Sequence, residues 1–314
     1  MLTKSLDFIG RRATRFLGIG VLLGLAVPPL ATLARPLLVP ALLIPLTIAL
    51  VRLDWSAMGD YARRPLFVTA AIVWLLVVSP IAVWGALAPI PMPKALYHAL
   101  VLTAAASPIT SSAAIALLLG LDAALAVVVI VVSTALLPFT LPVLARGLLG
   151  LELHIDLATF MLRLGAMVGA SFAAALLVRR MVPTSAVARN ARALDAVSVI
   201  NLVIFAMAIM DGVTVFALQR PGYVALATAA AFTANLALQA MGTAVWVKLG
   251  MRRALTMGLM SGNCNMGLVM VALGPDATFE MIVFFAMAQL PMFMLPGLLT
   301  PVYRRLVRRA APRL

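Results

Sequence analysis

Two long apolar stretches of the sequence are interrupted by polar residues, proline and glycine. One interruption runs from Ser107 to Ser112 (SPITSS) and the other from Ser261 to Asn265 (SGNCN). Hydroxyl and amide groups at such breaks either satisfy the backbone groups that a helix releases or bind a solute. The half-helices that follow direct partial positive charge at the break, which suits an anion. Paired breaks in two halves of a chain indicate the binding site of a membrane transporter.

The composition requires a membrane-spanning chain around these breaks. Hydrophobic residues make up 64% of the 314 residues and charged residues only 11%. At about 20 apolar residues a span, we expect an all-α membrane protein of ten transmembrane helices. The expected spans are 17–34, 37–51, 66–88, 95–119, 123–146, 157–178, 195–218, 222–247, 254–274 and 278–302. We interpret the first as a retained helix, because removing it as a signal peptide would leave an odd number of spans.

The net charge of +14 does not indicate binding to nucleic acid, because the basic residues are concentrated on one side of the membrane. The outer loops hold four basic residues, and Arg163 lies within a span, which leaves 19 of the 24 Lys and Arg on the side of the N-terminus. This bias is typical of the positive-inside rule. It predicts a multi-pass protein of a bacterial inner (plasma) membrane, with both termini cytoplasmic and the basic ends against anionic headgroups.

The chain also repeats itself at an offset of 154 residues. LGLD at 119–122 lies over LGPD at 273–276, FTLP at 139–142 lies over FMLP at 293–296, and the two breaks coincide. We therefore expect two halves of five spans, residues 1–150 and 151–314. Because five is odd, the second half enters the membrane in the opposite sense, and such inverted repeats favour transport by alternating access.

The two breaks resemble the crossovers of the bile acid:sodium symporter family. The first resemblance includes Gly120-Leu-Asp122, Val132-Ser-Thr134 and Pro138 after the SPITSS run, and the second rests on Asn265-x-Gly267-Leu268. It implies crossed, broken spans 4 and 9, a core of spans 3–5 and 8–10, and a panel of spans 1, 2, 6 and 7. The family's substrates imply an organic, anionic or amphipathic solute between core and panel. Cation/proton antiporters and auxin-efflux-like carriers share this architecture.

The family's sodium ligands are replaced in this sequence. Their positions are occupied by Trp74, Ala113, Ala126, Ile130, Met260 and Cys264, whereas Ser112 and Asn265 are retained. A hard cation needs several oxygen ligands, and no carboxylate is left to balance its charge. We therefore expect a sodium-independent protein with no metal site and no cofactor. Trp74 either fills a vacated ion site or stacks on the solute.

We expect the solute to lie between the polar residues of the breaks and spans 6 and 7. The candidate residues are Thr110, Ser111, Ser112, Asn263, Asn265, Asp211 and Arg163. A carboxylate at the depth of Asp211 is costly and needs a cavity or a partner. It either carries solute or a proton, or forms a structural ion pair for which Arg163 is the candidate partner. We expect Asp122 and Asp276 to cap the helices that they precede, and Glu280 to lie in the first turn of span 10.

Three functional classes remain, and they differ in what the spans must contain. A secondary transporter or facilitator fits the paired breaks, with proton coupling through Asp211 as one possibility. A transporter-like sensor or partner-binding subunit is the alternative, because it tolerates the loss of ion ligands. An enzyme is not expected: a nucleophile such as Ser112 needs a base, and we place both histidines, His98 and His154, on the outer side.

Overall fold

The computed structural model describes residues 13–53, 59, 61, 63–150 and 156–310. Helices make up the regular structure of these residues, without a strand. Seven helical stretches are long and apolar enough to cross a membrane: 28–52, 65–87, 123–149, 157–181, 191–219, 221–249 and 279–298. Residues 1–12, 151–155 and 311–314, which include both termini and His154, lie outside the described residues.

Contacts divide the chain into two units. Unit 1 comprises 1–53 and 166–228, and unit 2 comprises 54–165 and 229–314. The boundaries fall within α11 (Leu157–Met181) and α15 (Pro221–Trp246), so each of these helices contributes residues to both units.

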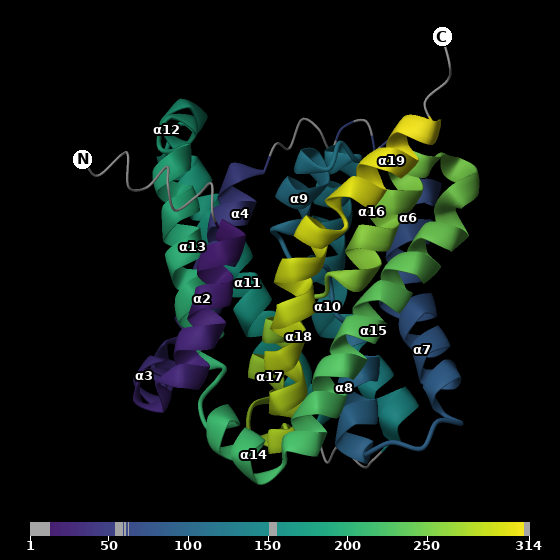
Figure 1. Cartoon of the computed structure of the whole chain (residues 1–314). Helices are drawn as coiled ribbons and strands as arrows, with labels where there is room; N and C mark the ends of the chain where they lie inside the picture. Colours follow the sequence, from purple (N-terminus) through teal and green to yellow (C-terminus); the bar gives the residue numbers. More distant parts are fainter. Residues whose placement is uncertain (1–12, 54–58, 60, 62, 151–155, 311–314) are drawn as a thin grey trace. The chain divides into compact units, whose positions relative to one another are not determined.

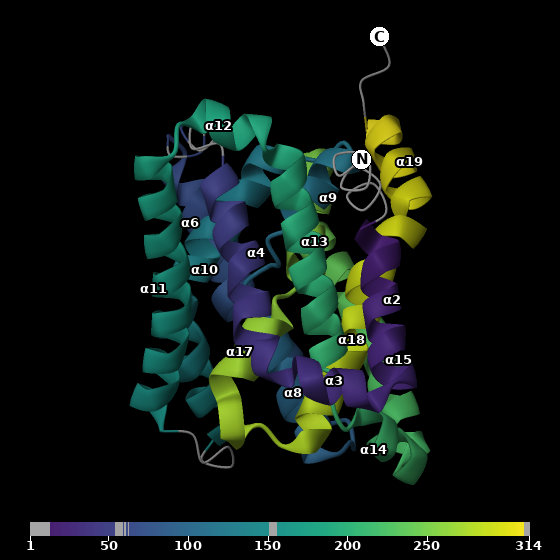
Figure 2. The same cartoon turned by 90° about the vertical axis from the view of Figure 1, so that its left-hand side faces the viewer.

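Unit 1 is built on α13 (Ala191–Ala208), which packs against α2 (Ala13–Ala26), α3 (Pro28–Ala34) and α4 (Leu38–Arg52) (Figure 2). A Cβ at Gly24 would lie 2.7 Å from the Met207 carbonyl oxygen, and one at Gly20 would lie 2.9 Å from that of Val203. Small residues four apart allow this close approach of two helices, as in other membrane proteins. α12 (Thr184–Arg189) and α14 (Val213–Gln219) complete the unit.

Unit 2 contains the interrupted helices (Figure 1). In chain order it holds α6 (Pro65–Val73), α7 (Ser79–Leu87), α8 (Lys94–Ala105), α9 (Ser112–Leu118), α10 (Ala123–Leu149), α16 (Met251–Gly262), α17 (Met266–Leu273), α18 (Phe279–Leu298) and α19 (Thr300–Ala310), together with parts of α11 and α15. A π-helical turn over Trp74–Val78 joins α6 to α7.

Within unit 2, α15 and α16 pack with their backbones almost in contact. A Cβ at Gly258 would lie 2.5 Å from the Gln239 carbonyl oxygen, and one at Gly262 would lie 2.7 Å from that of Asn235. This approach brings the amide side chains of α15 to the end of α16, where the second break begins.

The expected spans and the observed helices agree except where helices break. Expected spans 4 and 9 are the pairs α8/α9 and α16/α17, and α2 covers only part of the first expected span. Arg35 and Pro36, expected between spans 1 and 2, lie in a 3-10 turn within the continuous helical stretch 28–52. The all-helical class is confirmed, while the ten-helix inverted repeat stays a prediction.

Candidate functional site

The first break separates α8 from α9. α8 ends at Ala105, Ala106 is extended, and α9 begins at Ser112. Pro108 explains the interruption, because it has no N–H to donate and disfavours a helical conformation at Ser107.

The second break separates α16, which ends at Gly262, from α17, which begins at Met266. Asn265 is the N-cap of α17, and its side-chain oxygen accepts a hydrogen bond from the Leu268 amide at 3.3 Å. An asparagine at this position supplies an acceptor to one of the unpaired N–H groups of the first turn. Both expected interruptions are therefore confirmed.

The two breaks satisfy each other's backbone. The Ile109 amide donates to the Asn263 carbonyl at 2.8 Å, and the Asn265 amide donates to the Ser107 carbonyl at 2.7 Å. Pro108 and Cys264 face each other in an isolated antiparallel bridge between these bonds. Backbone groups that hydrocarbon could not satisfy thus find partners in the opposite break. We call residues 106–112 and 262–266 together the crossing.

A chain of buried side chains supports the crossing from α15. Asn235 donates its amide to the Gly262 carbonyl at 2.8 Å and to Asn263 Oδ1 at 3.3 Å. Gln239 donates to Asn235 Oδ1 at 2.6 Å, and the Tyr303 hydroxyl of α19 donates to Gln239 Oε1. We call Asn235, Gln239 and Tyr303 the amide relay. The two amides are four residues apart on α15, whereas Tyr303 lies 64 residues from Gln239, and no local signal in the sequence points to it.

The crossing retains polar atoms without a partner in the described part of the chain. Asn263 and Ser112 are completely buried, yet Asn263 Nδ2 and Ser112 Oγ have no hydrogen-bond partner there. Ser107 Oγ, by contrast, accepts from Thr134 at 3.2 Å. Buried polar groups are nearly always paired, so these two unpaired groups stand out among the buried side chains of the crossing. Thr110 and Ser111 lie beside them in the turn before α9 and are partly exposed.

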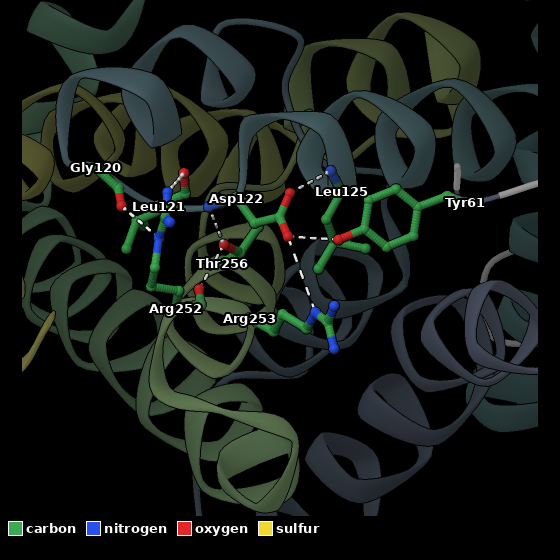
Figure 3. A network of polar contacts seen from close by, with 8 residues as sticks. All are labelled: Tyr61, Gly120, Leu121, Asp122, Leu125, Arg252, Arg253 and Thr256. Carbon is green, nitrogen blue, oxygen red and sulfur yellow. Dashed lines mark hydrogen bonds and ion pairs between the residues drawn. The ribbon is translucent and has the colours of Figure 1, made fainter. Parts of the chain in front are cut away.

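Both second half-helices end on a left-handed glycine and an arginine. After α9, Gly120 has φ +71°, and Arg252 donates to the carbonyls of Gly120 and Leu121 at 3.0 and 3.3 Å (Figure 3). After α17, Gly274 has φ +58°, and Arg163 donates to the Leu273 carbonyl at 3.1 Å. A cation at the C-terminal end of a helix interacts favourably with its dipole. Arg163 is therefore held at the end of α17 opposite the crossing.

Asp122 follows α9 and forms several polar contacts there. Its carboxylate caps α10 by accepting from the Leu125 amide at 3.0 Å, as expected, and it also accepts from the Tyr61 hydroxyl (Figure 3). The Asp122 amide donates to Thr256 of α16 at 3.0 Å, and Arg253 lies 4.0 Å from the carboxylate. Tyr61 precedes the α6 span; burial, followed by the hydrogen bond to Asp122, raises its pKa to about 12.

The corresponding expectation for Asp276 was wrong. Gly274–Asp276 form a 3-10 turn, and α18 begins only at Phe279, where Thr278 accepts from the Met281 amide at 3.4 Å. Asp276 instead lies 3.3 Å from the Arg163 guanidinium. Glu280 occupies the first turn of α18, as expected.

A model of the sodium bile acid symporter family matches residues 39–219, which is more than half of the chain. The chain belongs to this family. The resemblance that the two breaks indicated is thereby confirmed, and membership makes a membrane transporter the general class of the protein. No curated protein matches the chain in a sequence comparison.

The side chains at the family's sodium positions do not fit a sodium ion. Trp74 is 7% exposed and donates its indole N–H to Ser261 Oγ at 3.0 Å, and the Cys264 thiol donates to the Ser261 carbonyl at 3.1 Å. Met260, Ala126 and Ile130 are buried and offer a thioether and methyl groups. Sodium needs oxygen ligands, whereas these positions supply donors and apolar groups. The hydrogen bond to Ser261 holds the Trp74 indole in the buried interior of unit 2.

Asp211 belongs to unit 1 and has partners there. It accepts from Thr32 Oγ1 at 2.7 Å and from Arg35 at 3.1 Å, beside Gly212, whose φ is +76°. Asp211 and its candidate partner Arg163 each form an ion pair with another residue within their own unit. The structure thus brings Thr110, Ser111, Ser112, Asn263 and Asn265 together at the crossing, and it gives Arg163 and Asp211 separate local partners.

Proposed function

We propose that the protein is a secondary transporter or facilitator that moves a small organic anion across the membrane without sodium. The observation that carries the proposal is the crossing: two broken helices that complete each other's backbone, with free, buried polar atoms of Asn263 and Ser112 between them. Family membership supports a membrane transporter, and the polar groups of the crossing support an anionic solute.

An anionic solute is supported by the donors at the crossing. Asn263 Nδ2 is a free donor, the Ser112 hydroxyl is free to donate, and the N-terminal end of α17 adds roughly half a positive charge. In the described residues of 106–112 and 262–266 no carboxylate competes with the solute. An organic acid is the class of solute that these groups complement.

Sodium independence is supported by the side chains that replace the ligands. The transporter then works as a uniporter, or with protons as the coupling ion. Alternating access is supported by the division of the chain into two units with boundaries inside α11 and α15, since such transporters move one bundle against another.

Purified protein in liposomes tests the proposal with a panel of labelled organic acids. We expect uptake of at least one acid at equal rates in sodium and in choline buffer. Asn263→Ala and Ser112→Ala each remove one of the free polar groups. Each should therefore weaken binding of that acid roughly ten- to hundredfold, because a hydrogen bond to a charged group contributes about 1.5–3 kcal/mol.

Two control substitutions match these variants in residue type. Within the described part of the chain, Asn201→Ala removes an amide that bonds only to the Val197 carbonyl of its own helix. Ser133→Ala likewise removes a buried hydroxyl that bonds there only to carbonyls of α10. Both should transport like the parent. Transport of a confirmed acid that is unchanged in both crossing variants would move the solute site elsewhere.

A further inference from the structure

The end of the chain carries a basic helix directly after a membrane span. α18 ends at Leu298 and α19 begins at Thr300. α19 contains two arginine pairs, Arg304/Arg305 and Arg308/Arg309, all four exposed, while Leu306 and Val307 are partly covered and Tyr303 is buried. The sequence has no acidic residue after Glu280. The arginines therefore form a concentrated positive surface, here called the arginine cluster.

Among the residues that the structure describes, no carboxylate forms an ion pair with the arginine cluster. α19 packs against α16, whose first turn carries Arg252 and Arg253 and adds further positive charge. The carboxylate beside this turn, Asp122, already accepts from Leu125 and Tyr61 and faces Arg253 (Figure 3). Four or more arginines on a helix next to a span are typical of a surface that binds anionic lipid headgroups.

The buried side of the same helix is linked to the crossing through the amide relay. Tyr303, the member of the amide relay on α19, adjoins Arg304 in the chain. Its hydroxyl donates to Gln239, the next member. Gln239 orients Asn235, and Asn235 holds the Gly262 carbonyl and Asn263 Oδ1. Every member of this path is buried. A shift of α19 would thus break the bond between Tyr303 and Gln239, and with it the support that Gln239 gives to Asn235 and Asn235 gives to Asn263.

We propose that the arginine cluster binds anionic phospholipid headgroups and that this binding keeps the Tyr303 hydroxyl bonded to Gln239. The charge of the lipid then regulates how often the crossing opens. Guanidinium groups suit this partner because they form paired hydrogen bonds with phosphate oxygens. The consequence for solute transport rests on the function proposed above. The link from lipid to crossing does not, because it concerns only the chain and the bilayer.

Cys264 provides a direct reporter of the crossing. It is the single cysteine of the sequence, it is 1% exposed, and it faces Pro108 in the bridge between the breaks. Alkylation of its thiol by N-ethylmaleimide therefore requires the crossing to open. We compare the alkylation rate in phosphatidylcholine vesicles with that in mixed phosphatidylcholine–phosphatidylglycerol vesicles.

We expect anionic lipid to slow alkylation of the parent protein roughly three- to tenfold, the range set by one hydrogen bond between neutral groups. Tyr303→Phe keeps the arginine cluster but removes the hydroxyl, so it should be alkylated at the fast rate in both vesicles. Replacing Arg305 and Arg309 together by Gln should remove most of the lipid effect while leaving the rate in phosphatidylcholine unchanged.

The matched control replaces Arg180 and Arg189, two exposed arginines of unit 1, by Gln. This variant should respond to lipid charge like the parent. The bulk pH of the anionic vesicles is raised to offset the lower pH at an anionic surface, which would otherwise slow thiol alkylation in every variant.

Two sets of results would overturn the proposal. A parent rate independent of lipid charge, or an equal loss of the lipid effect in the Arg180/Arg189 control, would remove the arginine cluster as the lipid site. If anionic lipid slowed alkylation of Tyr303→Phe as much as that of the parent, the amide relay would not link α19 to the crossing. Alkylation is measured without solute, so a failure to find a transported acid would leave these results unaffected.

Discussion

The two units contain helix breaks of opposite character. In unit 2 the crossing is neutral: Asn263 is completely buried, and its neighbours are backbone groups and the Asn235 amide. In unit 1 the break between α13 and α14 is charged: Asp211 is 18% exposed, and its partner Arg35 is 71% exposed. Each break satisfies its released backbone groups locally, but the charged side chains of unit 1 are at least partly exposed whereas Asn263 of the crossing is completely buried.

This difference follows from the cost of burial. A buried charge loses several kcal/mol of hydration, which an ion pair recovers only with favourable geometry. Neutral amides carry a smaller penalty and can be paired completely. The crossing can therefore be closed deep in the protein without an ion, whereas Asp211 needs a partner that reaches water. The comparison supports our proposal that solute binds at the crossing of unit 2 and that Asp211 has a structural role.

The largest effect is expected from Asn235→Ala. This change leaves the Gly262 carbonyl, Asn263 Oδ1 and the Gln239 amide without a partner. Such buried groups cost about 1–3 kcal/mol each, so we expect a loss of about 3–5 kcal/mol in unfolding free energy, measured by denaturation in detergent. Asn201→Ala is the matched control and should change stability by less than about 1 kcal/mol. Equal losses in the two variants would contradict the special role of the relay.

Glycine substitutions compare the two breaks directly. A Cβ at Gly262 would lie 2.4 Å from Gln239 Cγ and 2.7 Å from the Asn235 carbonyl oxygen. We therefore expect Gly262→Ala to destabilise by about 3 kcal/mol through overpacking. Gly212→Ala places a β-carbon on a residue with φ +76°, a conformation that costs a side-chain-bearing residue about 1 kcal/mol. Thermal unfolding of both variants measures the difference, and the reverse order would mean that α15 and α16 separate easily.

Asp211→Asn is expected to have a small effect. Because Arg35 is mostly exposed, the ion pair contributes about 1 kcal/mol or less. Transport of a confirmed solute should keep its pH dependence, because the carboxylate is a structural partner of Thr32 and Arg35. A shifted pH profile in liposomes would show that Asp211 carries a proton and would reverse the assignment of roles to the two units.

The smallest effect concerns Tyr61 at alkaline pH. Its pKa is raised from 10.0 to about 12 by burial and by Asp122. A raised pKa contributes stability that is complete below the unfolded value and is lost as pH rises through the folded value. The parent should therefore lose slightly more stability than Tyr61→Phe between about pH 10 and 12. Identical pH curves for the two proteins would mean that the hydroxyl is free in solution.

Local signals in the sequence were sufficient to locate the breaks. Pro108, the polar runs and the repeat offset predicted both interruptions, and Asp122 was recognised as a cap because capping depends on residues close in the chain. The prediction that Asp276 caps α18 was wrong because Pro275 favours a 3-10 turn, so that the helix begins only at Phe279. Local pattern alone did not distinguish Asp276 from Thr278.

Partners distant in sequence could not be predicted in the same way. Arg163 and Asp211 are both plausible ion-pair partners by depth, yet each found another residue, 113 and 176 positions away. The Trp74–Ser261 and Tyr303–Gln239 contacts join residues 187 and 64 positions apart. Such choices depend on helix packing, which no local pattern records. The residues of the crossing were therefore predicted, while the side chains that hold it were found only in the structure.

The central claim is that neutral hydrogen bonds hold the crossing where sodium would otherwise be bound. Thermal unfolding of the purified protein in Na+, K+ and choline chloride at equal ionic strength tests it directly. We expect the same Tm in all three salts, because Trp74, Met260 and Cys264 supply no ligand for the ion. A ligand present at 100 times its Kd stabilises by about 2.7 kcal/mol. A Tm that rises with millimolar Na+ alone would therefore reveal a sodium site and contradict the account.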